Sequence, residues 1–92
     1  MIVKFIGALR RFSGAEELAV ECKDCTSIGA LMAKLVKDMP GLRQSLFDQQ
    51  LVDPRANALI IVNGREISVL DGFETKLKDG DQVVFIPIVH GG

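Results

Sequence analysis

The sequence predicts a single α+β domain in which one main helix packs across a mixed sheet of about five strands. The chain has 92 residues, which suit one hydrophobic core and leave no room for two. One segment carries apolar residues at helical spacing, whereas several others are rich in β-branched residues. Asn63-Gly64, a strong hairpin signal, lies between two of those β-rich segments.

The N-terminal part of the chain predicts a β-hairpin. Residues 2–9 are mostly β-branched, aromatic or apolar, which favours a strand with Lys4 on one face. Residues 11–14 supply a turn, and residues 17–22 alternate between polar and apolar side chains as a second strand. We therefore expect these two strands to pair through a loop of several residues.

Two cysteines, Cys22 and Cys25, form an isolated C-x-x-C pair. Two ligands do not complete a tetrahedral zinc site, so we predict no metal site, and an iron–sulfur cluster of the ferredoxin kind needs four cysteines. A thioredoxin-like redox pair requires a βαβ context that the sequence lacks. Because Cys22 continues the apolar alternation of Leu18 and Val20, we expect it to pack in the core, with a redox or metal role for the cysteines as the alternative.

Residues 28–39 form the clearest predicted helix. Thr26 is a suitable N-cap residue, and Pro40-Gly41 ends the helix. One helical face carries the apolar positions Ile28, Leu31, Met32, Leu35, Val36 and Met39. We expect this apolar face of the helix to form part of the hydrophobic core. In the following segment, Leu42, Leu46 and Phe47 allow a short helix, and Asp53-Pro54 marks a turn.

The C-terminal half of the chain predicts three strands. Residues 58–62 form a buried strand, Asn63-Gly64 turns the chain, and residues 65–70 return as a short strand. Turns at 71–72 and 79–81 follow, and residues 83–89 form a nearly uninterrupted apolar strand that we expect at the centre of the sheet. The predicted order is β-β-α-β-β-β, which is the β-grasp arrangement.

Composition excludes several classes of function. Eleven basic and twelve acidic residues give a formal charge of −1, without the basic excess typical of nucleic-acid binding. The longest apolar runs are far shorter than the roughly 20 residues of a membrane helix. Residues 1–6 include Lys4 and do not resemble a signal peptide. We therefore expect a soluble cytoplasmic protein that binds neither nucleic acid nor membrane directly.

The sequence ends in His90-Gly91-Gly92, and we divide the chain into a domain of residues 1–89 and a flexible tail of residues 90–92. Glycines have no Cβ, so a tail of this kind can enter a narrow active site. The carboxylate of Gly92 is ionised at neutral pH and can attack the α-phosphate of ATP to form an acyl-adenylate. The chain has no phosphate-binding loop of its own, so a partner must perform this activation.

Five short motifs in order resemble one protein family. They are Ala8-Leu9-Arg10 with Gly14, Thr26-Ser27-Ile28-Gly29-Ala30-Leu31, Val62-Asn63-Gly64, Leu77-Lys78-Asp79-Gly80-Asp81-Gln82-Val83, and Pro87 followed by Gly91-Gly92. The sequence resembles, from end to end, the ubiquitin-like sulfur carriers: the molybdopterin synthase small subunit, the thiamine sulfur carrier and the ubiquitin-related modifier. The resemblance implies a β-grasp (ubiquitin-like) roll.

The resemblance also implies a mechanism in which Gly92 and Gly91 are the reactive end. A ubiquitin-activating-type enzyme would adenylate Gly92 with ATP and magnesium, and a persulfide-derived sulfur would replace AMP to give a thiocarboxylate. The chain binds no cofactor and is not a catalyst alone. It would serve as the sulfur-donating small subunit of a synthase, with an acceptor enzyme such as the molybdopterin synthase large subunit.

Two departures from the family pattern favour other acceptors. Ile88 stands where molybdopterin carriers commonly have a second proline, and His90 stands where they have a small residue. A histidine there is more like the ubiquitin-related modifier, so conjugation to protein lysines and sulfur donation to tRNA are the alternatives. A third class of function is a plain interaction module that uses the same fold without any chemistry at its C-terminal tail.

A docking surface is expected on the last strand. Strand alternation places Val84, Ile86 and Ile88 on the face opposite Val83 and Phe85. By resemblance to ubiquitin, Val83 and Phe85 are core. The residues of the opposite face are then partly exposed, together with Ile2 and Ile6, and could form a docking surface. Pro87 and His90 complete the candidate partner-binding residues. The alternative is that residues 41–57 fold over this face.

Overall fold

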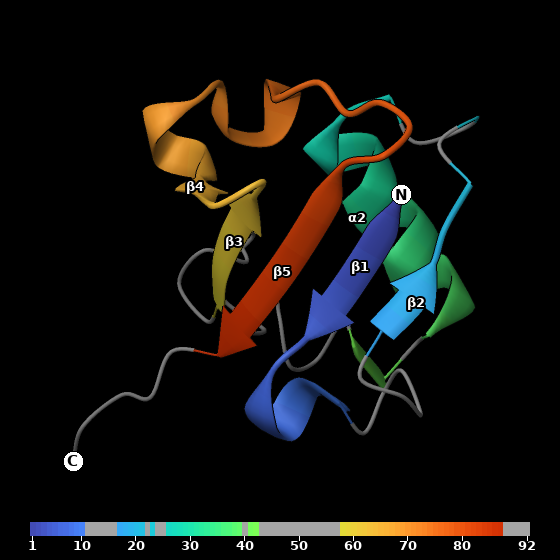
Figure 1. The fold of residues 1–92 in the computed structure, drawn as a ribbon. Coiled ribbons are helices and arrows are strands. Elements are labelled where there is room, and N and C mark those ends of the chain that lie inside the picture. The colour runs from blue at the N-terminus through green and yellow to red at the C-terminus, as the bar shows by residue number, and fades with distance from the viewer. Residues whose placement is uncertain (11–16, 22, 24–25, 40, 43–57, 88–92) are drawn as a thin grey trace, which may run out of the picture.

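A computed structural model describes residues 1–10, 17–21, 23, 26–39, 41–42 and 58–87. Figure 1 shows a five-stranded sheet with strand order β2-β1-β5-β3-β4 and the helix α2 behind it. The elements are β1 (Ile2–Phe5), β2 (Glu17–Ala19), α2 (Ile28–Asp38), β3 (Ala58–Val62), β4 (Arg65–Glu66) and β5 (Gln82–Pro87). This arrangement confirms the predicted α+β fold and the order of its elements.

Strand β5 lies at the centre of the sheet, as predicted. It pairs in parallel with β1, so that Phe5 lies opposite Phe85, and antiparallel with β3, so that Val62 lies opposite Val83. The other neighbour of β1 is β2, which runs antiparallel to it as the expected hairpin partner. The sheet is therefore mixed, and its central strand carries the chain toward its C-terminal residues.

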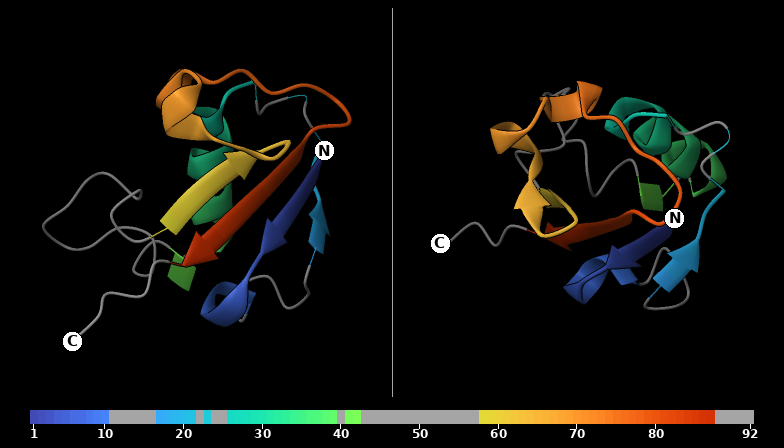
Figure 2. Two further views of the ribbon diagram at one scale, coloured as in Figure 1. Left: turned by 60° about the vertical axis from the view of Figure 1, so that its left-hand side comes forward. Right: turned by 45° about the horizontal axis from the view of Figure 1, so that its top comes forward.

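The hydrophobic core lies between α2 and one face of the sheet (Figure 2). Alternate residues of β5, Val83 and Phe85, are fully buried there, and the Phe85 ring stacks on Phe5 with centroids 5.3 Å apart. The helix contributes most of its predicted apolar stripe: Ile28, Leu31, Met32 and Leu35 are buried, and Val36 and Met39 are half-buried. Burial of apolar area on this one face is the main favourable contribution to folding.

The N-cap of the helix lies one residue later than the sequence predicts. Ser27, not Thr26, is the N-cap, and its Oγ accepts a hydrogen bond from the Ala30 N–H at 3.1 Å. Ser27 has extended backbone angles because it forms a β-bridge with Lys76, and the Thr26 carbonyl accepts from the Leu77 N–H. A tertiary contact with the 75–77 segment therefore selects between two adjacent capping residues.

Three predicted strands are shorter in the structure. Residues 2–9 form a strand only as far as Phe5, because Gly7 has φ +61° and starts the 3₁₀ turn η1 (Gly7–Leu9). Strand β4 ends at Glu66, whose carboxylate accepts from the Ser68 N–H and caps the 3₁₀ turn η4 (Ile67–Val69). Strand β2 ends at Ala19 rather than at residue 22.

Some predictions fall outside the described residues. They concern the turn at residues 11–14, the packing of Cys22 and its pairing with Cys25, the helix end at Pro40, the short helix at Leu46 and Phe47, and the turn at Asp53-Pro54. These stay predictions. Leu42, which lies in the same part of the sequence, is fully buried in the core.

The prediction that residues 58–62 form a buried strand is wrong for one face. Ala58 and Ile60 are fully buried, but Leu59 has 40% of its surface exposed and Ile61 is half-buried. The run is apolar throughout, so its sequence pattern does not distinguish the two faces. The helix covers only one of them, which leaves the other face of an apolar strand accessible.

The turn at Asn63-Gly64 has the positive φ values that the sequence predicts, 50° and 85°. Asn63 is further held by Asp81, a buried carboxylate. The Asn63 Nδ2 donates to Asp81 Oδ1 at 2.9 Å, and the Lys78 N–H donates to Asp81 Oδ2 at 2.9 Å. Asp81 thus joins two turns at the same end of the sheet.

We expect Asp81→Ala to lower the free energy of unfolding by about 2–3 kcal/mol, because it leaves two polar groups without their acceptor. The matched control is Asp79→Ala, which removes an exposed carboxylate two residues away and should change stability by less than about 0.5 kcal/mol. Urea denaturation of both variants measures the difference. Equal stability of the two would contradict the structural role given to Asp81.

None of the helices in the described part of the chain is long and apolar enough to cross a membrane.

Candidate functional site

The face of the sheet that points away from α2 forms a mainly apolar surface, which we call the outer face. It includes Ile2, Lys4, Leu59, Ile61, Val84 and Ile86. The strand registers place Ile86 directly opposite Leu59, and Val84 directly opposite Ile61. Leu59 and Ile2 are 40% and 37% exposed, so this surface is accessible to a partner.

One ion pair borders the apolar part of the outer face. The Lys4 Nζ lies 3.3 Å from a carboxylate oxygen of Glu17 on the neighbouring strand β2. Lys4 also lies opposite Val84 in the parallel pairing of β1 and β5. The outer face is therefore apolar over β3 and β5 and carries compensating charges over β1 and β2.

The C-terminal end of β5 is supported by the turn η1. A Cβ added to Gly7 would lie 3.3 Å from the Pro87 Cγ, so the backbone of Gly7 packs closely against the proline ring. Pro87 also lies opposite Ala58, the first residue of β3. The end of the central strand is thus held from both sides, at the point where the chain continues into residues 88–92.

The structure separates the predicted site residues into two groups. Val84 and Ile86 are half-buried on the outer face, which confirms the predicted alternation against Val83 and Phe85, and Pro87 ends β5. Ile2 also lies on the outer face, and Ile6, just past β1, is half-buried. Ile88, His90, Gly91 and Gly92 lie outside the described residues, as does most of the 41–57 segment that is the alternative cover of this face.

Sequence reasoning did not include Leu59 and Ile61 among the candidate docking residues. The alternation of side chains along a strand would have placed them on one face, opposite Ala58 and Ile60. The signal was hidden because all five residues of β3 are apolar. Only the pairing of β3 with β5 shows that these two side chains extend the surface formed by Val84 and Ile86.

The outer face is mainly apolar, with few charged groups. The strand registers place three charged residues on it: Lys4 and Glu17, which form an ion pair, and Glu66 of β4 opposite Ile61. In the described part of the chain, no group of three or more His, Cys, Asp or Glu side chains is placed to hold a metal ion.

Comparison with known protein families identifies the chain. The model of the ThiS family matches residues 3–92, which include all of the sheet except Ile2, and the last residue of the sequence. The chain belongs to the ThiS family. This is a family of ubiquitin-like sulfur carriers and protein modifiers, and the observed β-grasp sheet with its single main helix is its fold.

The matches to individual relatives cover nearly the whole length of this ThiS family chain. It is 32% identical to small archaeal modifier protein 3 of Haloferax volcanii over 90 residues, which cover 98% of this chain and 96% of the relative. The solution structure of small archaeal modifier protein 1 from Methanosarcina acetivorans matches with a TM-score of 0.82 and 28% identity, covering 99% of this chain and 94% of that one.

A third relative has a different functional name. It is a Pyrococcus furiosus protein provisionally named subunit 1 of a molybdopterin converting factor. Its structure matches with a TM-score of 0.75 and 27% identity, covering 96% of this chain and 95% of that chain. The ThiS family chain is therefore similar to proteins named for protein modification and for cofactor synthesis alike.

Proposed function

We propose that this chain is a sulfur carrier whose reactive group is the carboxylate of Gly92. The observation that carries the proposal is the position of β5. This strand is central and ends at Pro87, and residues 88–92 follow it in the sequence. Five residues in an extended conformation span roughly 16 Å, which is enough to enter the active site of a second protein.

The proposed chemistry takes place on the C-terminal carbonyl carbon. The Gly92 carboxylate attacks the α-phosphate of ATP, and pyrophosphate leaves, which gives an acyl-adenylate. The outer sulfur of a persulfide on the donor protein then forms a C–S bond to the same carbon, and the C–O bond to AMP breaks. A second thiol of the donor attacks the S–S bond, so that the donor becomes a disulfide and the sulfur stays on the Gly92 carbonyl carbon. The product is a Gly92 thiocarboxylate. The absence of a Cβ on Gly91 and Gly92 lets nucleotide and enzyme backbone approach closely.

In this proposal the chain presents the reacting group and its partners supply the catalysis. A ubiquitin-activating-type enzyme binds ATP and magnesium and docks on the outer face, through Val84 and Ile86 together with Leu59 and Ile61. Pro87 and His90 lie along the path to the active site. A second enzyme then accepts the sulfur. An apolar surface on an otherwise solvated sheet face is the feature that such docking requires.

For the acceptor, we propose a precursor of molybdopterin, with this chain as the small subunit of the synthase. Similarity to the Pyrococcus furiosus protein supports this choice. Conjugation of Gly92 to protein lysines is the second candidate function, and the similarity to small archaeal modifier protein 3 favours it. Both functions use the same activation, and sulfur donation to tRNA would use it as well.

Intact-mass spectrometry tests the function. The purified chain is incubated with ATP, magnesium, a sulfur donor and a cell extract from the source organism. The expected result is a mass increase equal to the exchange of one oxygen for sulfur, and omission of ATP should abolish it. Lysine-linked conjugates without the thiocarboxylate would favour the modifier function. No ATP-dependent product of either kind would contradict both.

We expect Ile86→Ala to slow thiocarboxylate formation about tenfold at low carrier concentration, because a central residue of a docking surface contributes about 1–2 kcal/mol to binding. The fold should be retained, since the side chain is half-exposed. The matched control is Val69→Ala, which shortens a 74% exposed side chain outside the outer face and should leave the rate unchanged. An unchanged rate for Ile86→Ala would remove the outer face from the proposal.

A further inference from the structure

Strand β2 forms one edge of the sheet, and its outer backbone groups point away from β1. The Val20 N–H donates to the Met1 carbonyl at 2.9 Å, which places Val20 in a hydrogen-bonded pair. In an antiparallel ladder such pairs alternate with pairs whose N–H and C=O groups point outward. The backbone groups of Glu17 and Ala19 therefore point outward, and no described strand pairs with them.

A groove runs beside this edge, between β2 and α2. It has a volume of about 460 Å³, and its apolar lining comes from both elements. Leu18 and Val20 supply one wall, and Leu35 and Met39 of α2 supply the other. The Lys34 Nζ and an Asp38 Oδ lie 3.9 Å apart at its rim. An extended segment paired with β2 would place every second side chain in this groove.

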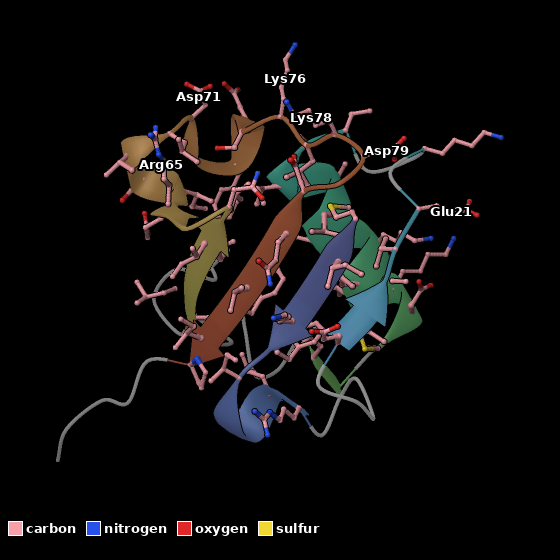
Figure 3. The ribbon with its side chains drawn as sticks, viewed as in Figure 1. Glu21, Arg65, Asp71, Lys76, Lys78 and Asp79 are labelled. Carbon is pink, nitrogen blue, oxygen red and sulfur yellow. The ribbon has the colours of Figure 1, made fainter. Side chains whose placement is uncertain are left out.

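The other face of β2 belongs to the outer face and carries two carboxylates, of which Glu17 is paired with Lys4. The outward-facing positions Glu17, Ala19 and Glu21 follow one another at the spacing of alternate strand residues. Figure 3 shows the Glu21 side chain pointing away from β1, and no ion pair is formed by Glu21 in the described residues. A segment paired with β2 would place its remaining side chains along this acidic row, where basic residues are favoured.

We propose that the open edge of β2 binds an extended peptide segment of a partner protein by strand addition. The segment has apolar residues at alternate positions, which fill the groove against α2, and lysine or arginine at the positions between, which face Glu17 and Glu21. Backbone hydrogen bonds to Glu17 and Ala19 supply affinity that does not depend on sequence, and the alternating side chains supply specificity. This binding uses the β2 edge of the sheet rather than the apolar part of the outer face over β3 and β5, and it does not involve the chemistry of Gly92.

A second copy of this chain is a poor occupant of the same edge. If the β2 strands of two copies paired antiparallel, Glu17, Ala19 and Glu21 of each copy would all lie opposite residues of the other copy only when the pair is centred on Ala19. It would place Glu17 of each copy opposite Glu21 of the other, and like charges directly opposite one another destabilise a strand pair. The charge pattern therefore favours a basic segment from another protein over self-association.

Amide hydrogen exchange measured by NMR tests the proposal. The probe is a capped heptapeptide of alternating lysine and valine, added to the full-length chain. The Glu17 and Ala19 amides should exchange rapidly in the free protein and become protected when the peptide is bound. The Val20 amide already donates to Met1 and should not change. Protection of Glu17 and Ala19 that rises with protein concentration alone would overturn the proposal in favour of self-pairing.

Two variants separate strand addition from simple charge attraction. Ala19→Pro removes an outward N–H but no bond to β1, and it should weaken peptide binding by about tenfold or more. Glu21→Lys should weaken binding of the lysine peptide, while a glutamate–valine peptide should bind this variant better than the native chain. Thermal melting confirms that each variant is folded. Lysine-peptide binding that Ala19→Pro does not affect would show charge attraction alone and overturn the proposal.

Discussion

Removal of Gly91 and Gly92 is expected to reduce ATP-dependent thiocarboxylate formation by more than about a hundredfold, since even a small misplacement of a reacting group can have an effect of that size. The shortened chain ends at His90, so its terminal carboxylate lies about 7 Å short of the native position along an extended tail. It also carries a Cβ and an imidazole next to the reacting carbon. The measurement is the intact mass of the chain after reaction, followed over time.

The control for this deletion is His90→Ala, which preserves both the length of the tail and its two glycines. Because His90 is a candidate partner-binding residue, we expect this variant to react up to about tenfold more slowly than the native chain, a far smaller loss than that of the deletion. Both variants should melt at the native temperature, since the deletion leaves every described element intact. If the deletion variant instead supports full cellular function, the chain is an interaction module and the tail chemistry proposed for Gly92 does not occur.

Phe85→Ala is expected to lower the free energy of unfolding by about 3–5 kcal/mol, the range for truncation of a buried aromatic residue. Phe85 is fully buried on the central strand, and its ring stacks on Phe5 with an interplanar angle of 14°. The cavity would lie between α2 and three paired strands, where the backbone has little freedom to collapse. Because small domains have only about 5–15 kcal/mol of stability, the variant should be marginally folded.

Ile86→Ala provides the comparison on the same strand. The two positions are adjacent in sequence but point to opposite faces, so the loss of stability should be several times smaller for Ile86. Phe85→Ala should lose stability and activity together, whereas Ile86→Ala should lose activity while remaining folded. Urea denaturation and the rate of thiocarboxylate formation distinguish these outcomes. Similar stability losses at both positions would contradict the assignment of a solvent-facing outer face.

The local features of the sequence predicted most of the fold. The helix at Ile28–Asp38, the Asn63-Gly64 turn and the apolar strand at Gln82–Pro87 each rest on interactions within a few residues. Helical spacing, tolerance of positive φ, and a run of β-branched residues are properties that a single segment carries by itself. The element order followed from them, and the β-grasp arrangement followed from the order.

Element ends were less predictable because long-range contacts decide them. Ser27 replaces Thr26 as the N-cap because the 75–77 segment pairs with the start of the helix. Strand β1 ends early where Gly7 takes a positive φ beside Pro87, eighty residues further along the sequence. No pattern within a short window contains either of these partners.

The sequence by itself determined the fold class, the central position of the last strand, and the two terminal glycines on which the proposed chemistry depends. Tertiary structure alone decided which residues of β3 are core and which belong to the outer face. In β3 every residue is apolar, and the exposure of Leu59 and Ile61 follows only from the side on which α2 packs. The open edge of β2 has the same origin, since an unpaired strand edge depends on what the rest of the chain places beside it.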